Sequence, residues 1–227
     1  MKKLVVVCAG LLGAFAIVGF HQVPVGATRA DVRAIHELLP EKVPRPRTFE
    51  EEVGLILLVQ ERVLKASPEE RGIALNQPRE IADLLRARHG ACFDRSRAIE
   101  TALRSFGFQT RHASMYSTVE AGSALGALAT PDTLSHALTE VRTRRGWMIV
   151  DSRTRWAGLT ADGRPLDLGA VRKNADRQWS GAVKAPLPEI YGAPFTWVYG
   201  LYSRHGRFYP PYNPIPDLNW AEFAQNL

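Results

Sequence analysis

The chain has 227 residues, of which 45% are hydrophobic, 23% are charged and 9% are aromatic. This length can bury a core large enough for one globular domain, and this composition excludes a wholly disordered chain. The formal net charge of +6 comes from scattered basic residues without a run of five or more, which favours a soluble basic surface over nucleic-acid binding.

Residues 1–27 have the pattern of a targeting segment. Lys2 and Lys3 precede 17 uncharged residues, Leu4 to Phe20, and small residues before Ala27 suit a peptidase that cuts there. The apolar stretch is at the short end for a membrane span, so cleavage and retention as a single anchor both stay open. In each case we expect the folded part outside the cytoplasm, in a bacterial periplasm or at the outer face of the cytoplasmic membrane, with secretion also open.

Residues 28–47 contain three prolines and predict a tether, or an arm laid over the domain. We expect residues 48–227 to form a single domain. A helix should begin at Thr48, because Thr48 and Glu51 have capping-box spacing. Its apolar stripe is Val53, Ile56, Leu57, Val63 and Leu64. A second helix is expected from about Pro78 to His89-Gly90.

A third helix is predicted from about Cys92 to Phe106, with Gly107 as its C-terminal cap. Cys8 lies in the targeting segment, so Cys92 is the only cysteine expected in the exported body. A lone thiol in an oxidising compartment is expected either to be buried as a structural residue or to take part in a reaction. At a helix N-terminus, backbone N–H groups and the helix dipole stabilise a thiolate, and the same N–H groups can hold an oxyanion.

The strands are expected after this helix, at about 108–116, 134–141 and 146–151. The last two should form a hairpin joined by Arg142 to Arg145. If pairing is symmetric about Thr143/Arg144, His136 lies directly opposite Asp151, where a carboxylate can orient an imidazole. Nucleophilic catalysis needs a thiolate, a base and a group that orients the base, and Cys92, His136 and Asp151 supply these types.

Other residues compete for roles in the site. His112 and His205 have no acidic partner at an interpretable spacing, and His89 lies in a turn. No paired ligand spacing or phosphate-binding loop occurs, so we expect neither a metal nor a cofactor. Ten of the twenty aromatic residues lie between Tyr191 and Phe223. They are expected to pack over the sheet, with a strand at Phe195–Tyr202; the alternative is an aromatic substrate groove that includes Trp197 and Tyr202.

Residues 75–155 resemble the core of the transglutaminase-like (papain-like) superfamily. The motifs that carry the resemblance are Gly90-Ala91-Cys92, Gly107-Phe108-Gln109-Thr110-Arg111, Ser135-His136-Ala137, Glu140-Val141, Gly146-Trp147 and Val150-Asp151. The resemblance implies an α+β fold in which N-terminal helices pack on an antiparallel β-sheet and the catalytic cysteine starts a helix. It implies Cys92 as nucleophile, His136 as general base and acid, and Asp151 as the orienting acid.

The resemblance also implies attack on a carboxamide through a thioester, with a protein or peptide substrate. The oxyanion would be held by the backbone N–H of Cys92, with Gln77 as a candidate side chain. Leu138 departs from the pattern, because many relatives have an aromatic residue there. The sequence leaves two other functions open: a catalytically silent module that binds an envelope protein or polysaccharide, and an arylamine N-acetyltransferase-like enzyme, which the export signal disfavours.

Overall fold

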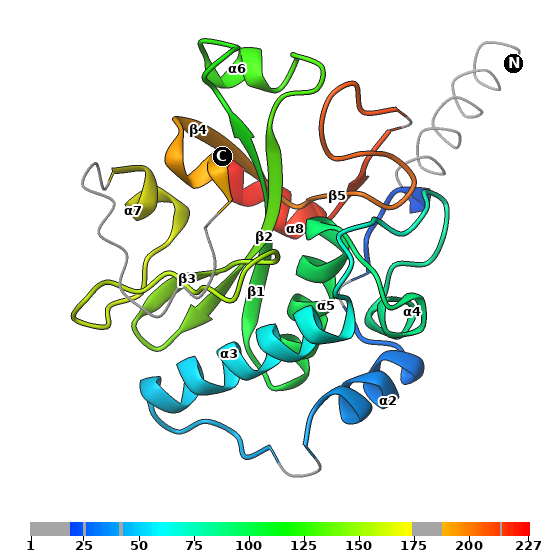
Figure 1. Cartoon of the computed structure of the whole chain (residues 1–227), viewed down its shortest axis with the longest axis vertical. Helices are drawn as coiled ribbons and strands as arrows, with labels where there is room; N and C mark the ends of the chain where they lie inside the picture. The colour runs from blue at the N-terminus through cyan, green and yellow to red at the C-terminus, as the bar shows by residue number, and fades with distance from the viewer. Residues whose placement is uncertain (1–18, 25, 41–42, 174–187, 214) are drawn as a thin grey trace, which may run out of the picture.

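A four-stranded antiparallel sheet lies at the centre of the fold, with strands in the order β3-β2-β1-β4 (Figure 1). The computed structural model describes residues 19–24, 26–40, 43–173, 188–213 and 215–227. The four strands are β1 (Gln109–Ser117), β2 (Ser135–Thr143), β3 (Gly146–Val150) and β4 (Phe195–Tyr199). They include the three strands expected from the sequence, and β1 lies between β2 and β4.

Helices pack on this sheet through α5, which contacts both β1 and β2. The helices that precede β1 are α2 (Arg29–Leu38), α3 (Phe49–Ala66), α4 (Ile81–Ala87) and α5 (Cys92–Ser105). α3 and α4 pack against α5, and α2 packs against α4. The α+β class with N-terminal helices on an antiparallel sheet is therefore confirmed. The expected capping box of Thr48 and Glu51 is present at the start of α3.

The helix α5 is more deeply buried than its sequence pattern indicates. One inward face was expected, but every residue from Asp94 to Leu103 is buried. The sheet covers one side of α5 and the other helices cover much of the rest, so its polar residues meet partners inside the protein. The apolar cluster between helices and sheet includes Ile56, Ile99 and Leu103. A second cluster, on the far face of the sheet, includes Met115, Leu138 and Ile149.

Residues 28–47 include an ordered helix. The sequence left a tether and an overlying arm as alternatives, and the structure forms α2, with a capping box between Thr28 and Asp31. Ile35 and Leu38 of α2 join the main apolar cluster. Prolines 40, 44 and 46 all follow α2, so they end the helix without preventing it. Part of the expected tether therefore belongs to the folded domain.

The strand expected at Phe195–Tyr202 is divided in two by Gly200. Gly200 has a φ of +74°, and a Cβ there would lie 2.6 Å from the carbonyl oxygen of Asn219. The chain turns at this glycine and leaves the main sheet. Residues Leu201–Tyr202 then form β5, which pairs with β6 (Asp217–Leu218) in a separate two-stranded sheet.

The remaining elements are short and lie outside the main sheet. They are α6 (Ala124–Ala127), α7 (Leu168–Lys173), η1 (Glu189–Gly192), α8 (Trp220–Phe223) and η2 (Ala224–Asn226). None of the helices in the described parts of the chain is both long and apolar enough to cross a membrane. Most of the apolar stretch of the expected targeting segment lies outside the described residues.

Candidate active site

Cys92 is the first helical residue of α5, as the sequence predicts. The turn before it is tight, because a Cβ at Gly90 would lie 2.5 Å from Cδ1 of Leu84. The Asp94 carboxylate accepts the backbone N–H of Ala91 at 3.0 Å. As a residue of the first turn, Cys92 has a backbone N–H with no partner inside the helix. The thiol is half-buried and stands at the positive end of the helix dipole.

The start of α5 is fixed by Asp94, which sequence reasoning did not identify. Its carboxylate also accepts the backbone N–H of Ile73 at 3.0 Å and pairs with the Arg79 guanidinium. Asp94 and Arg79 are 1% and 4% exposed, so solvent does not weaken this pair. The sequence signal for this role was the position of Asp94 as the third residue of the predicted helix. A carboxylate there commonly accepts the backbone N–H of the N-cap residue.

The β2–β3 hairpin has a different register from the expected one. Thr139 pairs with Val150 and Glu140 with Ile149, so the strands are shifted by two residues from symmetry about Thr143/Arg144. The turn residues have no Asn-Gly signal that would have fixed the register. Because a shift of two keeps every side chain on the same face, His136 and Asp151 still share a face, as diagonal rather than opposed residues.

His136 and Asp151 meet directly in this arrangement. Nε2 of His136 lies 2.7 Å from Oδ2 of Asp151, and both side chains are buried. Burial alone would lower the pKa of His136, but the charge of Asp151 and the neighbouring Cys92 raise it to about 10. Burial likewise opposes ionisation of Asp151, yet His136 lowers the pKa of Asp151 overall. The pair is therefore held as imidazolium and carboxylate at neutral pH.

Cys92 is close enough to His136 to help raise the pKa of the imidazole. Since Nε2 of His136 is engaged by Asp151, Nδ1 is the ring nitrogen that remains for the thiol. The structure thus brings together the three residue types that thiol catalysis requires, from the start of α5, the start of β2 and the end of β3. The arrangement can form a thiolate–imidazolium pair beside free backbone N–H groups.

Tyr191 completes the surroundings of Asp151, and the sequence gave no signal for it. The Tyr191 hydroxyl donates to Oδ2 of Asp151 at 2.8 Å, and its ring meets the His136 ring edge-on. Burial and the Asp151 charge raise the pKa of Tyr191 well above its usual value, so it remains a donor. Oδ1 of Asp151 accepts the backbone N–H groups of Arg153 and Thr154 at 2.8 and 2.6 Å.

Gln60 of α3 holds the loop that follows Asp151 from inside the protein. Its Nε2 donates to the carbonyl oxygens of Asp151 and Trp156 at 2.7 and 2.6 Å, and the side chain is 0% exposed. Buried amides of this kind hold a backbone in one conformation. Gln60 lies between Ile56 and Val63 on the predicted apolar stripe of the helix. A polar residue on an otherwise apolar stripe was a sequence signal that Gln60 has hydrogen-bond partners inside the protein.

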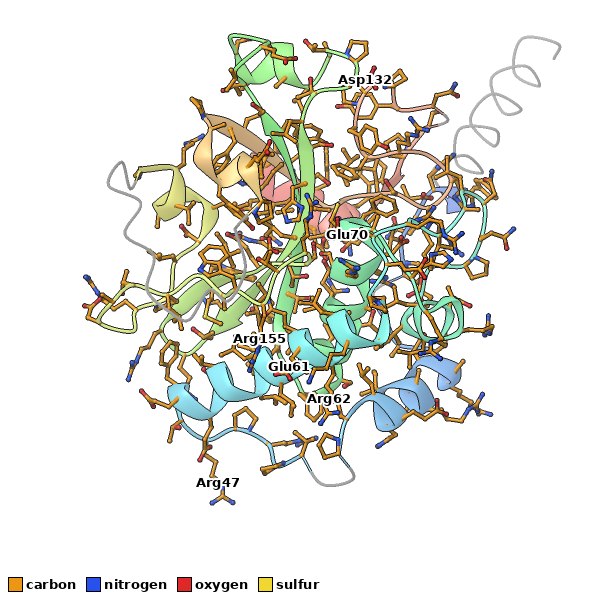
Figure 2. The ribbon with its side chains drawn as sticks, in the orientation of Figure 1. Arg47, Glu61, Arg62, Glu70, Asp132 and Arg155 are labelled. Atoms are coloured by element: carbon orange, nitrogen blue, oxygen red, sulfur yellow. The ribbon has the colours of Figure 1, made fainter. Side chains whose placement is uncertain are left out.

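Two ion pairs fix the same loop from outside. Arg155 pairs with Glu61 of α3 at 2.8 Å, and Arg153 pairs with Glu70 at 2.9 Å. Figure 2 shows Arg155 beside Glu61, at the point where α3 passes the loop. All four side chains are partly exposed, so these pairs add little to stability. Their effect is to orient the backbone next to Asp151.

The other predicted site residues lie in different environments. Gln77 is exposed, on the loop before α4, and its oxyanion role stays a prediction. Trp197 is half-buried on β4 and lines a cavity of about 630 Å³. Tyr202 is 3% exposed, and its hydroxyl contacts the carboxylates of Glu100 and Glu222, so it is a core residue without a face for substrate.

Two histidines have acidic partners that the sequence did not reveal. Nδ1 of His112 lies 2.7 Å from Glu100, and Nδ1 of His205 lies 2.6 Å from Asp217. The sequence offered neither histidine an acidic partner at an interpretable spacing, and the structure supplies both partners from distant elements. Glu100 comes from α5 and Asp217 from β6, so neither is a neighbour that strand or helix spacing could indicate.

Comparison with known proteins identifies the same region. Residues 61–152 match the family model of the transglutaminase-like superfamily. No curated protein and no solved structure matches the chain. The matched range ends one residue after Asp151 and includes α5, β1, β2 and β3.

Proposed function

We propose that this chain, which carries a transglutaminase-like core over residues 61–152, is an exported cysteine enzyme that acts on carboxamides. The observation that carries the proposal is the position of Cys92, which starts α5 beside a histidine that is paired with a buried carboxylate and whose pKa Cys92 helps to raise. Cys92 is the nucleophile, His136 the general acid and base, and Asp151 the group that orients His136.

The first chemical step forms a bond between Sγ of Cys92 and the carboxamide carbon. The carbonyl π electrons move to the oxygen, and in this proposal the backbone N–H of Cys92 stabilises that oxyanion. His136 begins this step as the imidazolium, because Asp151 and Cys92 raise its pKa to about 10. In the proposed step Cys92 attacks as the thiolate, with this imidazolium beside it as the opposite charge.

The second step breaks the C–N bond. The imidazolium of His136 gives its proton to the departing nitrogen, and the oxyanion re-forms a carbonyl, which leaves a thioester on Cys92. Neutral His136 then takes a proton from the incoming acceptor as that acceptor attacks the thioester. Water gives peptide hydrolysis or deamidation and an amine gives a crosslink, and all three outcomes use the same residues.

The substrate that we propose is a protein or peptide of the cell envelope. This rests on the N-terminal pattern, in which two lysines precede a long uncharged stretch. Contact with the membrane is then made only through this segment. No metal or cofactor is needed, because the proposed side chains supply the nucleophile, the acid and the base.

The test is the alkylation of Cys92 by iodoacetamide at pH 6, in a Cys8→Ser background so that one thiol remains. We expect folded Cys92 to react about 10-fold faster than the same thiol in the chain unfolded by urea, since few ordinary thiols are ionised at this pH. Peptide mass mapping should place the label on Cys92, and Cys92→Ser should take up none. An unreactive Cys92 in folded protein would contradict the proposal.

A catalytically silent binding module is the competing function, and one observation favours it. Trp197 lines a cavity of about 630 Å³ together with Tyr199 and Phe223, where an envelope polysaccharide or peptide could lie against the rings. That function predicts that Trp197→Ala abolishes the cellular phenotype while Cys92→Ala leaves it intact. The enzyme predicts the reverse.

A further inference from the structure

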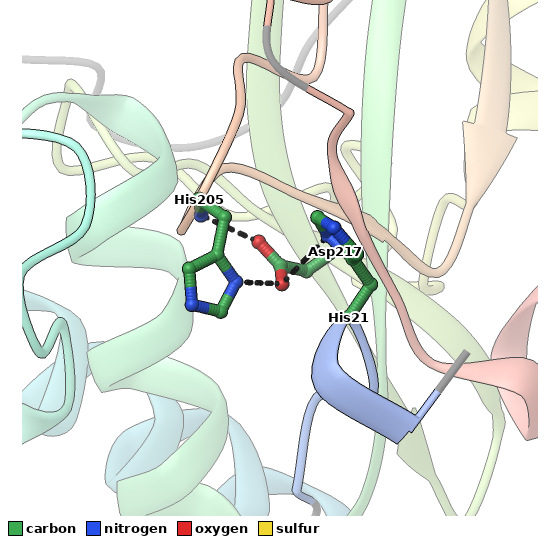
Figure 3. A group of neighbouring side chains, drawn as sticks. All are labelled: His21, His205 and Asp217. Atoms are coloured by element: carbon green, nitrogen blue, oxygen red, sulfur yellow. Dashed lines mark hydrogen bonds and ion pairs between the residues drawn. The ribbon is translucent and has the colours of Figure 1, made fainter. Parts of the chain in front are cut away.

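Three side chains that bind metals in many proteins converge away from Cys92. Figure 3 shows His21, His205 and Asp217 directed toward one another. Oδ1 of Asp217 lies 2.6 Å from Nδ1 of His205 and 3.5 Å from Nδ1 of His21. One ligand atom from each of the three can be chosen so that all lie within 4.8 Å of one another.

The backbone fixes this convergence, although the residues are far apart in sequence. Asp217 lies in β6, opposite Tyr202 of β5, and His205 follows β5. On the other edge of β6, Leu218 donates its N–H to the carbonyl oxygen of His21 at 2.8 Å. The backbone N–H of Val23 donates a hydrogen bond to the carbonyl oxygen of Leu218 at 2.9 Å. The three residues are therefore held by a hydrogen-bonded backbone.

The polar atoms of this cluster are incompletely satisfied. Asp217 is 0% exposed, and its Oδ2 is fixed by the backbone N–H of His205 at 2.7 Å. Nδ1 of His21 is buried and makes no hydrogen bond within the described structure. A buried imidazole nitrogen that lies 3.5 Å from a buried carboxylate without a hydrogen bond is costly unless a further group lies between them.

We propose that His21, His205 and Asp217 form a binding site for a divalent cation of borderline softness, with Zn²⁺ as the cation that fits best. Two imidazole nitrogens and one carboxylate oxygen are a donor set that zinc prefers, with a fourth position left for water. Tetrahedral zinc ligands lie about 3.3 Å apart. Binding therefore moves His205 slightly away from Asp217 and releases the proton that Nδ1 of His205 shares with it.

The surroundings also suit a cation. The side chains of His21 and His205 are 15% and 14% exposed, which leaves an approach from solvent. The ring of Phe20 stacks on His205 with a centroid distance of 4.1 Å and meets His21 edge-on. The fixed Oδ2 of Asp217 keeps its other oxygen directed at the site, as second partners of metal ligands do.

This site requires the chain to keep residues that cleavage at Ala27 would remove. The segment is packed into the domain: Val23 is 2% exposed, and the carbonyl oxygen of Pro24 accepts a hydrogen bond from the buried Arg97. Removal of these residues would leave Arg97 and β6 without those partners. The zinc site therefore requires that the segment with His21 stay attached to the domain.

The test uses the full chain in a Cys8→Ser, Cys92→Ser background, so that no thiol contributes to binding. Calorimetric titration with Zn²⁺ should show one ion bound per chain. His21→Ala and His205→Ala should each weaken binding by at least about 10-fold. His36→Ala, at an exposed histidine on α2, is the matched control and should leave binding unchanged.

Folding of each variant is followed by thermal denaturation with and without Zn²⁺. The ion should raise the melting temperature of the background protein and of His36→Ala, but not that of His21→Gln, which keeps a polar side chain of similar reach. Equal binding by the background and His21→Gln proteins, with both folded, would overturn the site. So would an intact mass, from protein recovered with cell membranes, that shows cleavage after Ala27.

Discussion

Two buried histidine–carboxylate pairs in this molecule have similar chemistry and different surroundings. His136 meets Asp151 at 2.7 Å, and His112 meets Glu100 at 2.7 Å. A tyrosine hydroxyl also contacts each carboxylate, from Tyr191 at 2.8 Å in the first pair and from Tyr202 at 2.9 Å in the second. Judged by the pair alone, either could be an acid–base site.

What differs is the neighbour of each imidazole. His136 has Cys92 at the start of α5, whereas Nδ1 of His112 faces Ser96, one turn further along the same helix. His112 and Ser96 are 0% exposed, and Nε2 of His112 is buried without a hydrogen bond. Burial raises the pKa of Glu100, but His112 and Arg104 outweigh it and lower the pKa to about 2.

Access and a nucleophile therefore define a thiol site more than a histidine–carboxylate pair does. The Ser96 hydroxyl has an imidazole partner, but it is buried and lies within the helix. It is therefore away from the positive end of the helix dipole, and a substrate has no route to it. The His112–Glu100 pair instead joins α5 to β1 inside the protein. Its loss should change stability, while loss of the His136–Asp151 pair should change the reactivity of Cys92.

The largest effect is expected when the structural pair is broken. Glu100→Gln should lower the free energy of unfolding by about 3–5 kcal/mol, because Arg104 and His112 lose a buried carboxylate. Urea denaturation measures this loss. In the fraction that stays folded, Cys92 should be alkylated within about twofold of the parent rate. A small stability loss with a large fall in that rate would reverse the roles of the two pairs.

The two tyrosines give a smaller and more selective comparison. Tyr191→Phe and Tyr202→Phe each remove a hydroxyl bonded to a carboxylate, and each should cost about 1.5–3 kcal/mol of stability. Only Tyr191→Phe should also shift the NMR signals of the His136 imidazole, since Tyr191 and His136 share Oδ2 of Asp151. An equal shift in Tyr202→Phe would mean that the two networks are coupled.

A pH dependence should follow from the raised pKa of His136. A histidine with a higher pKa in the folded chain contributes its full stability below the unfolded value of about 6.5 and loses it as the pH rises through the folded value. For His136 the folded value is about 10, so stability should fall by about 1.4 kcal/mol per pH unit between these limits. Thermal denaturation across this range measures the slope. Asp151→Asn should flatten it; an equal slope in that variant would assign the loss to other groups.

Local signals predicted the helices and the position of Cys92. The Thr48 capping box, the glycine before Cys92 and the apolar stripe of α3 all act within a few residues, so they can be read from sequence. The same kind of signal was present at Thr28 and Asp31, where the nearby prolines suggested a tether although a capped helix forms.

Longer-range relations were only partly predictable. The hairpin register was wrong by two residues, yet His136 and Asp151 still meet, because strand side chains alternate with a period of two. Tyr191 is 40 residues from Asp151 and arrives on a short 3₁₀ helix, so no periodic pattern connects them. The partners of His112 and His205 were missed for the same reason: contacts between distant elements leave no local signal.

The most direct test of the central claim is the rate at which iodoacetamide alkylates Cys92 in two matched variants, His136→Ala and His112→Ala. At pH 6, in the Cys8→Ser background, His136→Ala should lower the rate by about 10-fold, because the thiol loses the imidazolium that stabilises its thiolate. His112→Ala should lower stability but leave the rate of the folded protein within about twofold. Equal rates in the two variants would contradict the assignment of His136 as the partner of Cys92.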